Sequence, residues 1–130
     1  EGMSWDVSGV DWYSNMGDPS PTIGNLLAFP AQDIIVAEGN TWCGSMETSA
    51  KEQEVYLFRA MDWFRTHPSK RIRAYMIYEL LDEPLLKGGE AHYGLVANDA
   101  QGNIGEPKPL YYAVQALWRQ DADHTHSPKA

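Results

Sequence analysis

Three alternations of a strand-like segment with a helix-like segment constrain the fold of this 130-residue chain more than any other feature. The clearest strand is the apolar run at residues 33–37, and the clearest helix, residues 50–66, has apolar residues every three or four positions. Strands that alternate with helices pair in parallel, because each helix carries the chain back to the start of the next strand. The other predicted elements are strands at 6–14 and 72–78 and helices at 22–29 and 109–120.

A sheet of three parallel strands is narrow for a chain of this class. Parallel sheets usually have helices on both faces, and their edge strands present unpaired backbone groups. We therefore expect residues 1–120 to form a partial α/β domain that is completed by further sequence or by a partner chain. Residues 121–130 are predicted to be a polar tail, and residues 85–107 a long irregular stretch with a turn at 98–102.

Composition excludes several classes of partner. The net charge of -8 and the pI of about 4.8 argue against nucleic acid, which requires clustered Lys and Arg. The chain lacks the run of about 18 apolar residues that a membrane helix needs. Its single cysteine, Cys43, excludes an internal disulfide. Five Trp and seven Tyr supply flat apolar rings with polar edges, on which sugar rings stack.

Glu38 is the strongest candidate for a catalytic residue because it ends an apolar strand. Ile34, Ile35 and Val36 precede the carboxylate closely, and Gly39 follows it at once. In α/β folds the carboxyl ends of parallel strands are where ligands bind and chemistry takes place. The alternative is that Glu38 is a loop or helix-capping acid without a catalytic role.

Five segments of the chain carry a family resemblance in their order and spacing. They are residues 8–13 (SGVDWY), 34–42 (IIVAEGNTW), 75–84 (YMIYELLDEP), 89–95 (GEAHYGL) and 108–113 (KPLYYA). Together they resemble the last three βα units of a clan A glycoside hydrolase, which folds as a (β/α)8 barrel. The first three segments are similar to the sixth, seventh and eighth strands, and the last two to the eighth loop and the final helix. The resemblance covers the chain from about Trp5 to Trp118.

The resemblance implies a retaining glycosidase that acts on β-linked glycosides or polysaccharides. Glu38 would be the nucleophile, and Tyr13 would donate a hydrogen bond that keeps its carboxylate ionised and oriented. Neither a metal nor an organic cofactor is implied. The sequence itself does not fix a location, and the substrate class suggests an extracellular or periplasmic one. Tyr13 and Tyr78 have an alternative explanation as packing residues at the barrel rim. The implied substrate-binding residues are Trp12, Trp42, Tyr78, Asp82, Glu90 and His92.

The general acid/base of this clan is missing from the chain. The mechanism needs two carboxyl groups about 5 to 5.5 Å apart, and the clan's second one ends the fourth strand, commonly in an Asn-Glu pair. This sequence has no Asn-Glu pair. Glu79 and Asp82 lie near a strand end, but a neighbouring strand does not ensure that they face Glu38 across a substrate. We therefore expect little or no hydrolysis of aryl glycosides by the isolated chain.

Two functions remain open from the sequence. In the first, the chain is the C-terminal part of a glycoside hydrolase and associates with the N-terminal part of the barrel, which supplies the acid/base. In the second, it is a non-catalytic carbohydrate-binding or self-assembling α/β module that pairs its exposed strand edges in a homo-oligomer.

Overall fold

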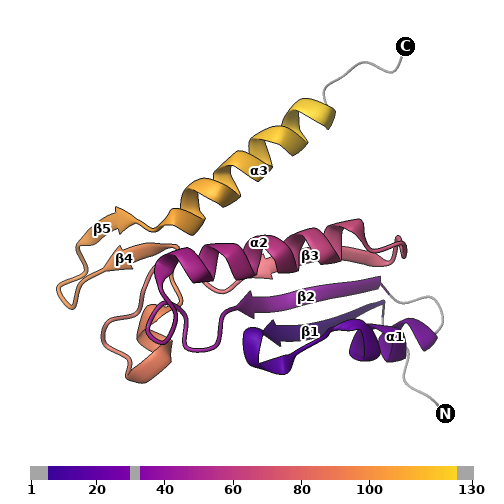
Figure 1. The fold of residues 1–130 in the computed structure, drawn as a ribbon, viewed down its shortest axis with the longest axis horizontal. Coiled ribbons are helices and arrows are strands. Elements are labelled where there is room, and N and C mark those ends of the chain that lie inside the picture. Colours follow the sequence, from indigo (N-terminus) through magenta and orange to yellow (C-terminus); the bar gives the residue numbers. More distant parts are fainter. Residues whose placement is uncertain (1–5, 30–32, 126–130) are drawn as a thin grey trace.

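A computed structural model describes residues 6–29 and 33–125, which form a small mixed α/β domain (Figure 1). Three strands pair in parallel in the order β1-β2-β3. A helix follows each strand along the chain, which confirms the α/β class and the three alternations predicted from the sequence. The strands are β1 (Val7–Tyr13), β2 (Asp33–Asn40) and β3 (Ile72–Ile77), and the helices are α1 (Ser20–Ala28), α2 (Ala50–Thr66) and α3 (Pro109–Thr125).

The long helix α2 begins at a capping box. The Ser49 hydroxyl accepts a hydrogen bond from the Glu52 backbone N–H, and the Glu52 carboxylate accepts one from the Ser49 N–H. This exchange satisfies two backbone donors that the first turn of a helix otherwise leaves free. Ser49 is thus the N-cap of α2.

Helices α1 and α2 pack against the same face of the sheet. Ile23 of α1 and Phe64 of α2 belong to one buried cluster with Ile34 and Val36 of β2. The opposite face is open in the described residues: Val7 and Met76 are 48% and 46% exposed there. Figure 1 shows α2 running along β2 and β3. The sheet therefore has one covered face and one face available to solvent, a ligand or more protein.

The segment predicted to be irregular, residues 85–107, contains regular structure. It forms the short 3₁₀ helix η2 (Gly88–His92) and an antiparallel hairpin of β4 (Val96–Asn98) and β5 (Ile104–Pro107). The irregular prediction is wrong because strands of three and four residues are too short to show a periodic pattern. The predicted turn is present, with the Gly102 N–H donating to the Asp99 carbonyl at 2.9 Å.

The C-terminal helix α3 extends beyond its predicted end at Gln120 to Thr125, so it includes the first half of the predicted polar tail. Residues 126–130 of that tail lie outside the described residues. Leu110 and Val114 of α3 pack against Leu57 of α2 in a second buried cluster. This contact fixes the start of α3 against α2.

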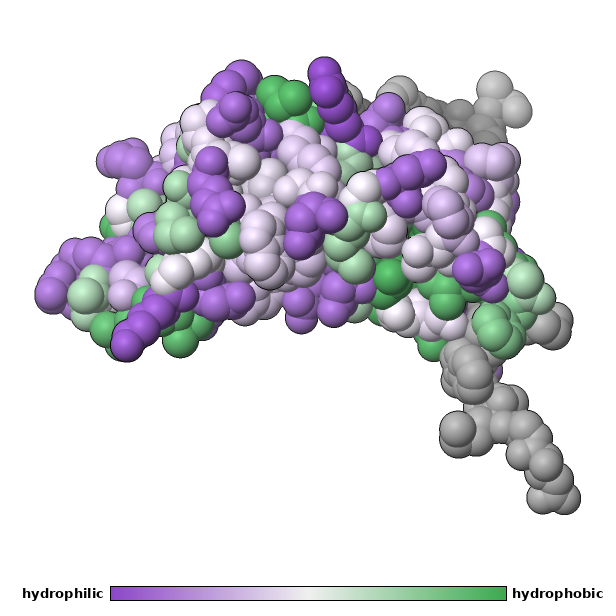
Figure 2. Space-filling model, turned by 60° about the horizontal axis from the view of Figure 1, so that its bottom comes forward, coloured by the Kyte–Doolittle hydropathy of each residue, from purple (hydrophilic) through white to green (hydrophobic). Residues whose placement is uncertain are grey.

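No helix within residues 6–29 and 33–125 combines the length and the apolar character that crossing a membrane requires. Figure 2 shows one face of the molecule, on which hydrophobic surface (green) lies in separate places between hydrophilic surface (purple).

Candidate functional site

Glu38 lies on the open face of the sheet because β2 contains one extra residue. Val10 of β1 pairs with Val36, and the next residue, Asp11, pairs with Glu38, so Ala37 has no partner in β1. Side chains alternate between the faces of a strand, and the extra residue therefore puts Glu38 opposite the buried Val36. Bulges of this kind occur often next to active sites, where they redirect one side chain.

Tyr13 and Glu38 are in direct contact at the carboxyl ends of adjacent strands. The Tyr13 hydroxyl donates a hydrogen bond to Oε2 of Glu38 at 3.0 Å. Burial, and then this hydrogen bond and the charge of Glu38, raise the pKa of Tyr13 well above its ordinary value. The phenol therefore stays neutral near pH 7 and keeps the proton that it donates to the carboxylate oxygen.

The raised pKa of Tyr13 predicts a loss of stability at alkaline pH. The unfolded chain releases this proton near pH 10 while the folded protein still holds it, so the contribution to folding is complete below pH 10 and is lost as the pH rises above it. We expect the free energy of unfolding to fall more steeply between pH 10 and 12 for the wild type than for Tyr13→Phe. Urea unfolding at each pH measures this, and equal slopes would contradict it.

Aromatic rings surround the Tyr13–Glu38 pair. The Tyr13 ring meets the rings of Trp42 and Tyr93 edge to face, with centroids 6.5 and 5.6 Å apart, and Tyr93 meets Tyr78 in the same way at 5.5 Å. Trp42 is 49% exposed and its backbone N–H donates to Ser14 Oγ at 2.8 Å. These four rings, Tyr13, Trp42, Tyr78 and Tyr93, form what we call the aromatic wall.

Tyr93 is the functional candidate that sequence reasoning missed. Its ring is buried, and its hydroxyl accepts a hydrogen bond from the Cys43 N–H at 3.2 Å. It comes close to Tyr13 and Tyr78 because residues 88–96 fold back beside the strand ends. The one sequence signal was its place in the segment at 89–95 that resembles the eighth loop of the barrel family.

Several carboxylates act on the Tyr78 hydroxyl. Burial raises the pKa of Tyr78, and the charges of Glu79, Glu83, Glu90 and Glu38 raise it further. These acids therefore lie within electrostatic range of one phenol, and the strand ends carry negative potential. Glu90 itself is exposed on η2.

Glu79 has the most perturbed carboxyl group of this region. Burial, followed by the charges of Glu83, Asp82 and Glu90, raises its pKa to about 7, with Lys108 acting in the opposite direction. Its Oε1 atom is buried without a hydrogen-bond partner among the described residues. A carboxyl group in such a place holds its proton to nearly neutral pH.

The raised pKa of Glu79 predicts that Glu79→Gln stabilises the fold at alkaline pH. The ionised carboxylate is disfavoured in the folded protein, so the wild type loses stability as the pH rises from about 4.5 to 7. Glutamine carries no charge at any pH. We expect a larger gain from Glu79→Gln at pH 8 than at pH 5 in urea unfolding, and an equal gain at both would contradict the assignment.

Three of the predicted substrate-binding residues have structural partners. Asp82 is buried and accepts hydrogen bonds from Lys108 Nζ at 2.7 Å and from the Gly94 N–H at 2.8 Å. The His92 carbonyl accepts from Lys108 Nζ at 3.3 Å. Trp12 is 4% exposed and lies in the core cluster of α1 and α2, so its ring offers no face to a sugar and the predicted substrate contact is not supported.

The described residues place no three His, Cys, Asp or Glu side chains in a group that could hold a metal ion. Comparisons of the chain with protein-family models and with curated proteins gave no match. The candidate site is therefore defined by its geometry: a carboxylate on Glu38 at the open face of the sheet, a neutral phenol on Tyr13, and the aromatic wall.

Proposed function

We propose that this chain is the C-terminal part of a retaining glycoside hydrolase that acts on β-linked glycosides or polysaccharides. The observation that carries the proposal is the 3.0 Å hydrogen bond from Tyr13 to Glu38 at the ends of two adjacent parallel strands. In this reaction the Glu38 carboxylate attacks the anomeric carbon while the acid/base, supplied by the rest of the barrel, gives its proton to the leaving oxygen as that bond breaks. The same residue then takes a proton from the water that releases the sugar from the carboxylate ester. Tyr13 positions the nucleophile through its hydrogen bond to Oε2 of Glu38.

The surroundings of Glu38 suit a sugar ring. Trp42 is half exposed and Tyr78 is partly exposed, so both can present ring faces to the C–H groups of a carbohydrate. The acids near Tyr78 can accept hydrogen bonds from sugar hydroxyls. Apolar rings and oxygen acceptors are therefore combined at one edge of the sheet.

The topology supports a segment of a (β/α)8 barrel as the architecture. The strands are adjacent in chain order, and α1 and α2 share one face of the sheet, whereas a doubly wound sheet has helices on both faces. The uncovered face would then be the inside of the barrel. Within the described residues β1 and β3 have no further strand beside them, and five more strands would close the barrel.

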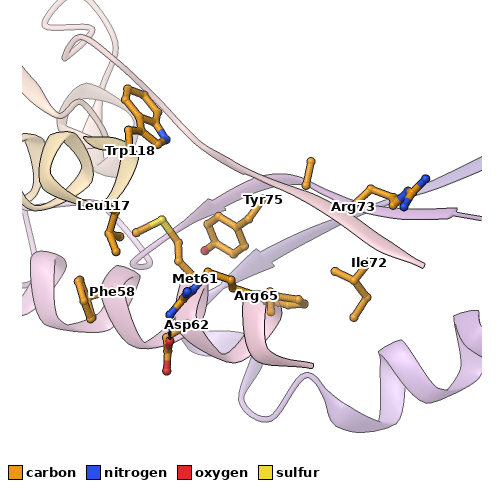
Figure 3. A pocket seen from close by; sticks show the side chains of 11 residues that line it. Phe58, Met61, Asp62, Arg65, Ile72, Arg73, Tyr75, Leu117 and Trp118 are labelled. Carbon is orange, nitrogen blue, oxygen red and sulfur yellow. Dashed lines mark hydrogen bonds and ion pairs between the residues drawn. The ribbon is translucent and has the colours of Figure 1, made fainter. Parts of the chain in front are cut away.

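A pocket beside β3 fits the same architecture. It has a volume of about 460 Å³ and lies between α2, β3 and α3. Figure 3 shows Phe58 and Met61 of α2, Tyr75 of β3, and Leu117 and Trp118 of α3 around it. Trp118 is 69% exposed. In a barrel the next βα unit would pack beside this free edge of β3 and cover these apolar groups.

The test is covalent trapping with a 2,4-dinitrophenyl 2-deoxy-2-fluoro-β-glycoside. Dinitrophenolate departs without a proton, so the missing acid/base is not needed for the first step, and the fluorine slows release of the sugar. Four reagents are tried, with gluco, xylo, manno and galacto configuration. We expect at least one of them to add one sugar to the chain, as seen by intact mass, and peptide mapping to place that sugar on Glu38. A label on another residue, or no label with any of the four, would overturn the proposal.

The unpaired edges of β1 and β3 also favour the second function, a carbohydrate-binding or self-assembling module. Light scattering on the purified chain separates the two functions. A stable oligomer that binds cellohexaose but is not labelled at Glu38 would favour this alternative.

A further inference from the structure

Asn40 is a buried polar side chain that the proposed reaction does not use. It ends β2 two residues after Glu38, and its exposed fraction is 0%. The intervening Gly39 is confined by the ring of Tyr75, whose hydroxyl would lie 2.2 Å from a Cβ at that position. The β2 backbone next to Glu38 is thus held closely on one side by β3. Asn40, the residue after Gly39, is the next side chain that can fix the position of this backbone.

The Asn40 amide joins segments that are far apart in the sequence. Its Nδ2 donates to the Tyr78 carbonyl and, at 2.8 Å, to the Tyr93 carbonyl. Its Oδ1 accepts from the Thr41 N–H at 2.7 Å and from Gln53 Nε2 at 3.0 Å. Removing such a group leaves its buried partners unsatisfied.

Each of these bonds acts next to the aromatic wall. Asn40 holds Tyr78 and Tyr93 through hydrogen bonds to their backbone carbonyls. Its bond to the Thr41 N–H fixes the backbone immediately before Trp42. One side chain is therefore bonded to the backbone at or next to three of the four rings. Gln53 belongs to the same buried network but donates to Asn40 and, at 3.4 Å, to Tyr93, and it has no bond to Tyr78 or Thr41.

We propose that Asn40 is a positioning residue for the sugar site, which sets the places of Tyr78, Tyr93 and Trp42 relative to Glu38. The inference rests on the proposed function and adds to it a residue that contacts neither sugar nor Glu38. It acts on binding, because two of the rings it holds, Trp42 and Tyr78, are exposed enough to serve as sugar platforms, while the carboxylate that reacts has its own donor in Tyr13.

Asn40→Ala and Gln53→Ala form a matched pair for the test, since both truncate a fully buried amide of one network. Labelling by the dinitrophenyl 2-fluoroglycoside is followed as a function of reagent concentration, which separates its apparent affinity from its limiting rate. For Asn40→Ala we expect an affinity weaker by about tenfold or more with the limiting rate within about threefold. For Gln53→Ala we expect both within about threefold, although its melting temperature also falls. Equal loss of affinity in both variants, or an unchanged affinity in Asn40→Ala, would overturn the proposal.

Near-ultraviolet circular dichroism provides a readout that needs no sugar. The signal of the aromatic wall should change in Asn40→Ala and persist in Gln53→Ala. If the wild type is not labelled, the proposed function fails while this comparison still decides whether Asn40 positions the rings.

Asn40→Asp covers the case in which Asn40→Ala does not fold. Its protonated carboxyl group has nearly the shape of the amide and can donate one of the two lost bonds. The near-ultraviolet signal and the affinity for the reagent should therefore recover as the pH falls, with no matching change in the wild type. A variant that stays unlike the wild type at low pH, while folded, would count against the positioning role.

Discussion

Replacing Glu38 by Gln should abolish covalent labelling at the site, with a rate reduced by about 10⁴-fold or more, because the amide cannot attack the anomeric carbon. The amide keeps the size of the side chain and still accepts the hydrogen bond from Tyr13. Binding of cellohexaose, followed by the fluorescence of the half-exposed Trp42, should therefore remain. In a complete barrel the same substitution should remove turnover and leave sugar binding.

Glu106→Gln is the matched control, since Glu106 is an exposed acid on β5. The Glu106→Gln protein should be labelled at Glu38 at the wild-type rate. A Glu38→Gln protein that labels or turns over at nearly the normal rate would show that Glu38 is not the nucleophile, and the proposed function would have to be abandoned.

Replacing Lys108 by Met should cost about 3–5 kcal/mol of folding free energy, because it leaves the Asp82 carboxylate buried without its cation. The two side chains are 10% and 9% exposed, and their charged atoms lie 2.7 Å apart. Lys108 also donates to Ser45 Oγ at 3.0 Å, so the pair joins the loop after β2, the loop after β3 and the start of α3. Urea unfolding at pH 7 measures the loss.

Two further variants show whether the buried charge is the cause. The double variant Asp82→Asn, Lys108→Met removes both charges and keeps an acceptor for the Gly94 N–H, so it should recover part of the stability. Lys51→Met breaks an ion pair whose lysine is 70% exposed and should cost less than about 1 kcal/mol. Equal losses for Lys51→Met and Lys108→Met would contradict the assignment.

The sequence predicts those parts of the fold that depend on local pattern. The apolar run before Glu38 and the spacing of Leu57 and Phe64 in α2 are local, and so the strands, the helices and their order follow from them. The placement of Tyr13 near Glu38 follows as well once the strands are taken as parallel neighbours, since Tyr13 ends β1 and Glu38 lies two residues before the end of β2.

Other features depend on contacts between distant segments. The run Asp-Ile-Ile-Val-Ala-Glu gives no sign of the extra residue at Ala37, which appears only when β2 is paired with β1. Tyr93 contacts Tyr13 and Tyr78 because the chain after β3 folds back beside the strand ends. Asp82 forms an ion pair with Lys108, which lies 26 residues further along the chain. Whether Trp12 packs in the core or contacts a ligand depends on which face of the sheet its side chain occupies. The residue type alone does not reveal that face.

The bulge at Ala37 has a consequence for how the site can be lost. The direction of the Glu38 side chain depends on the number of residues in this part of β2 and hardly on which residue stands at 37. Side-chain changes at that position leave the carboxylate where it is. Deleting Ala37, the one residue between Val36 and Glu38, would turn the same carboxylate into the hydrophobic layer under α2. A one-codon deletion would therefore remove the reactive group from the site and disrupt the core, while the composition of the protein would barely change.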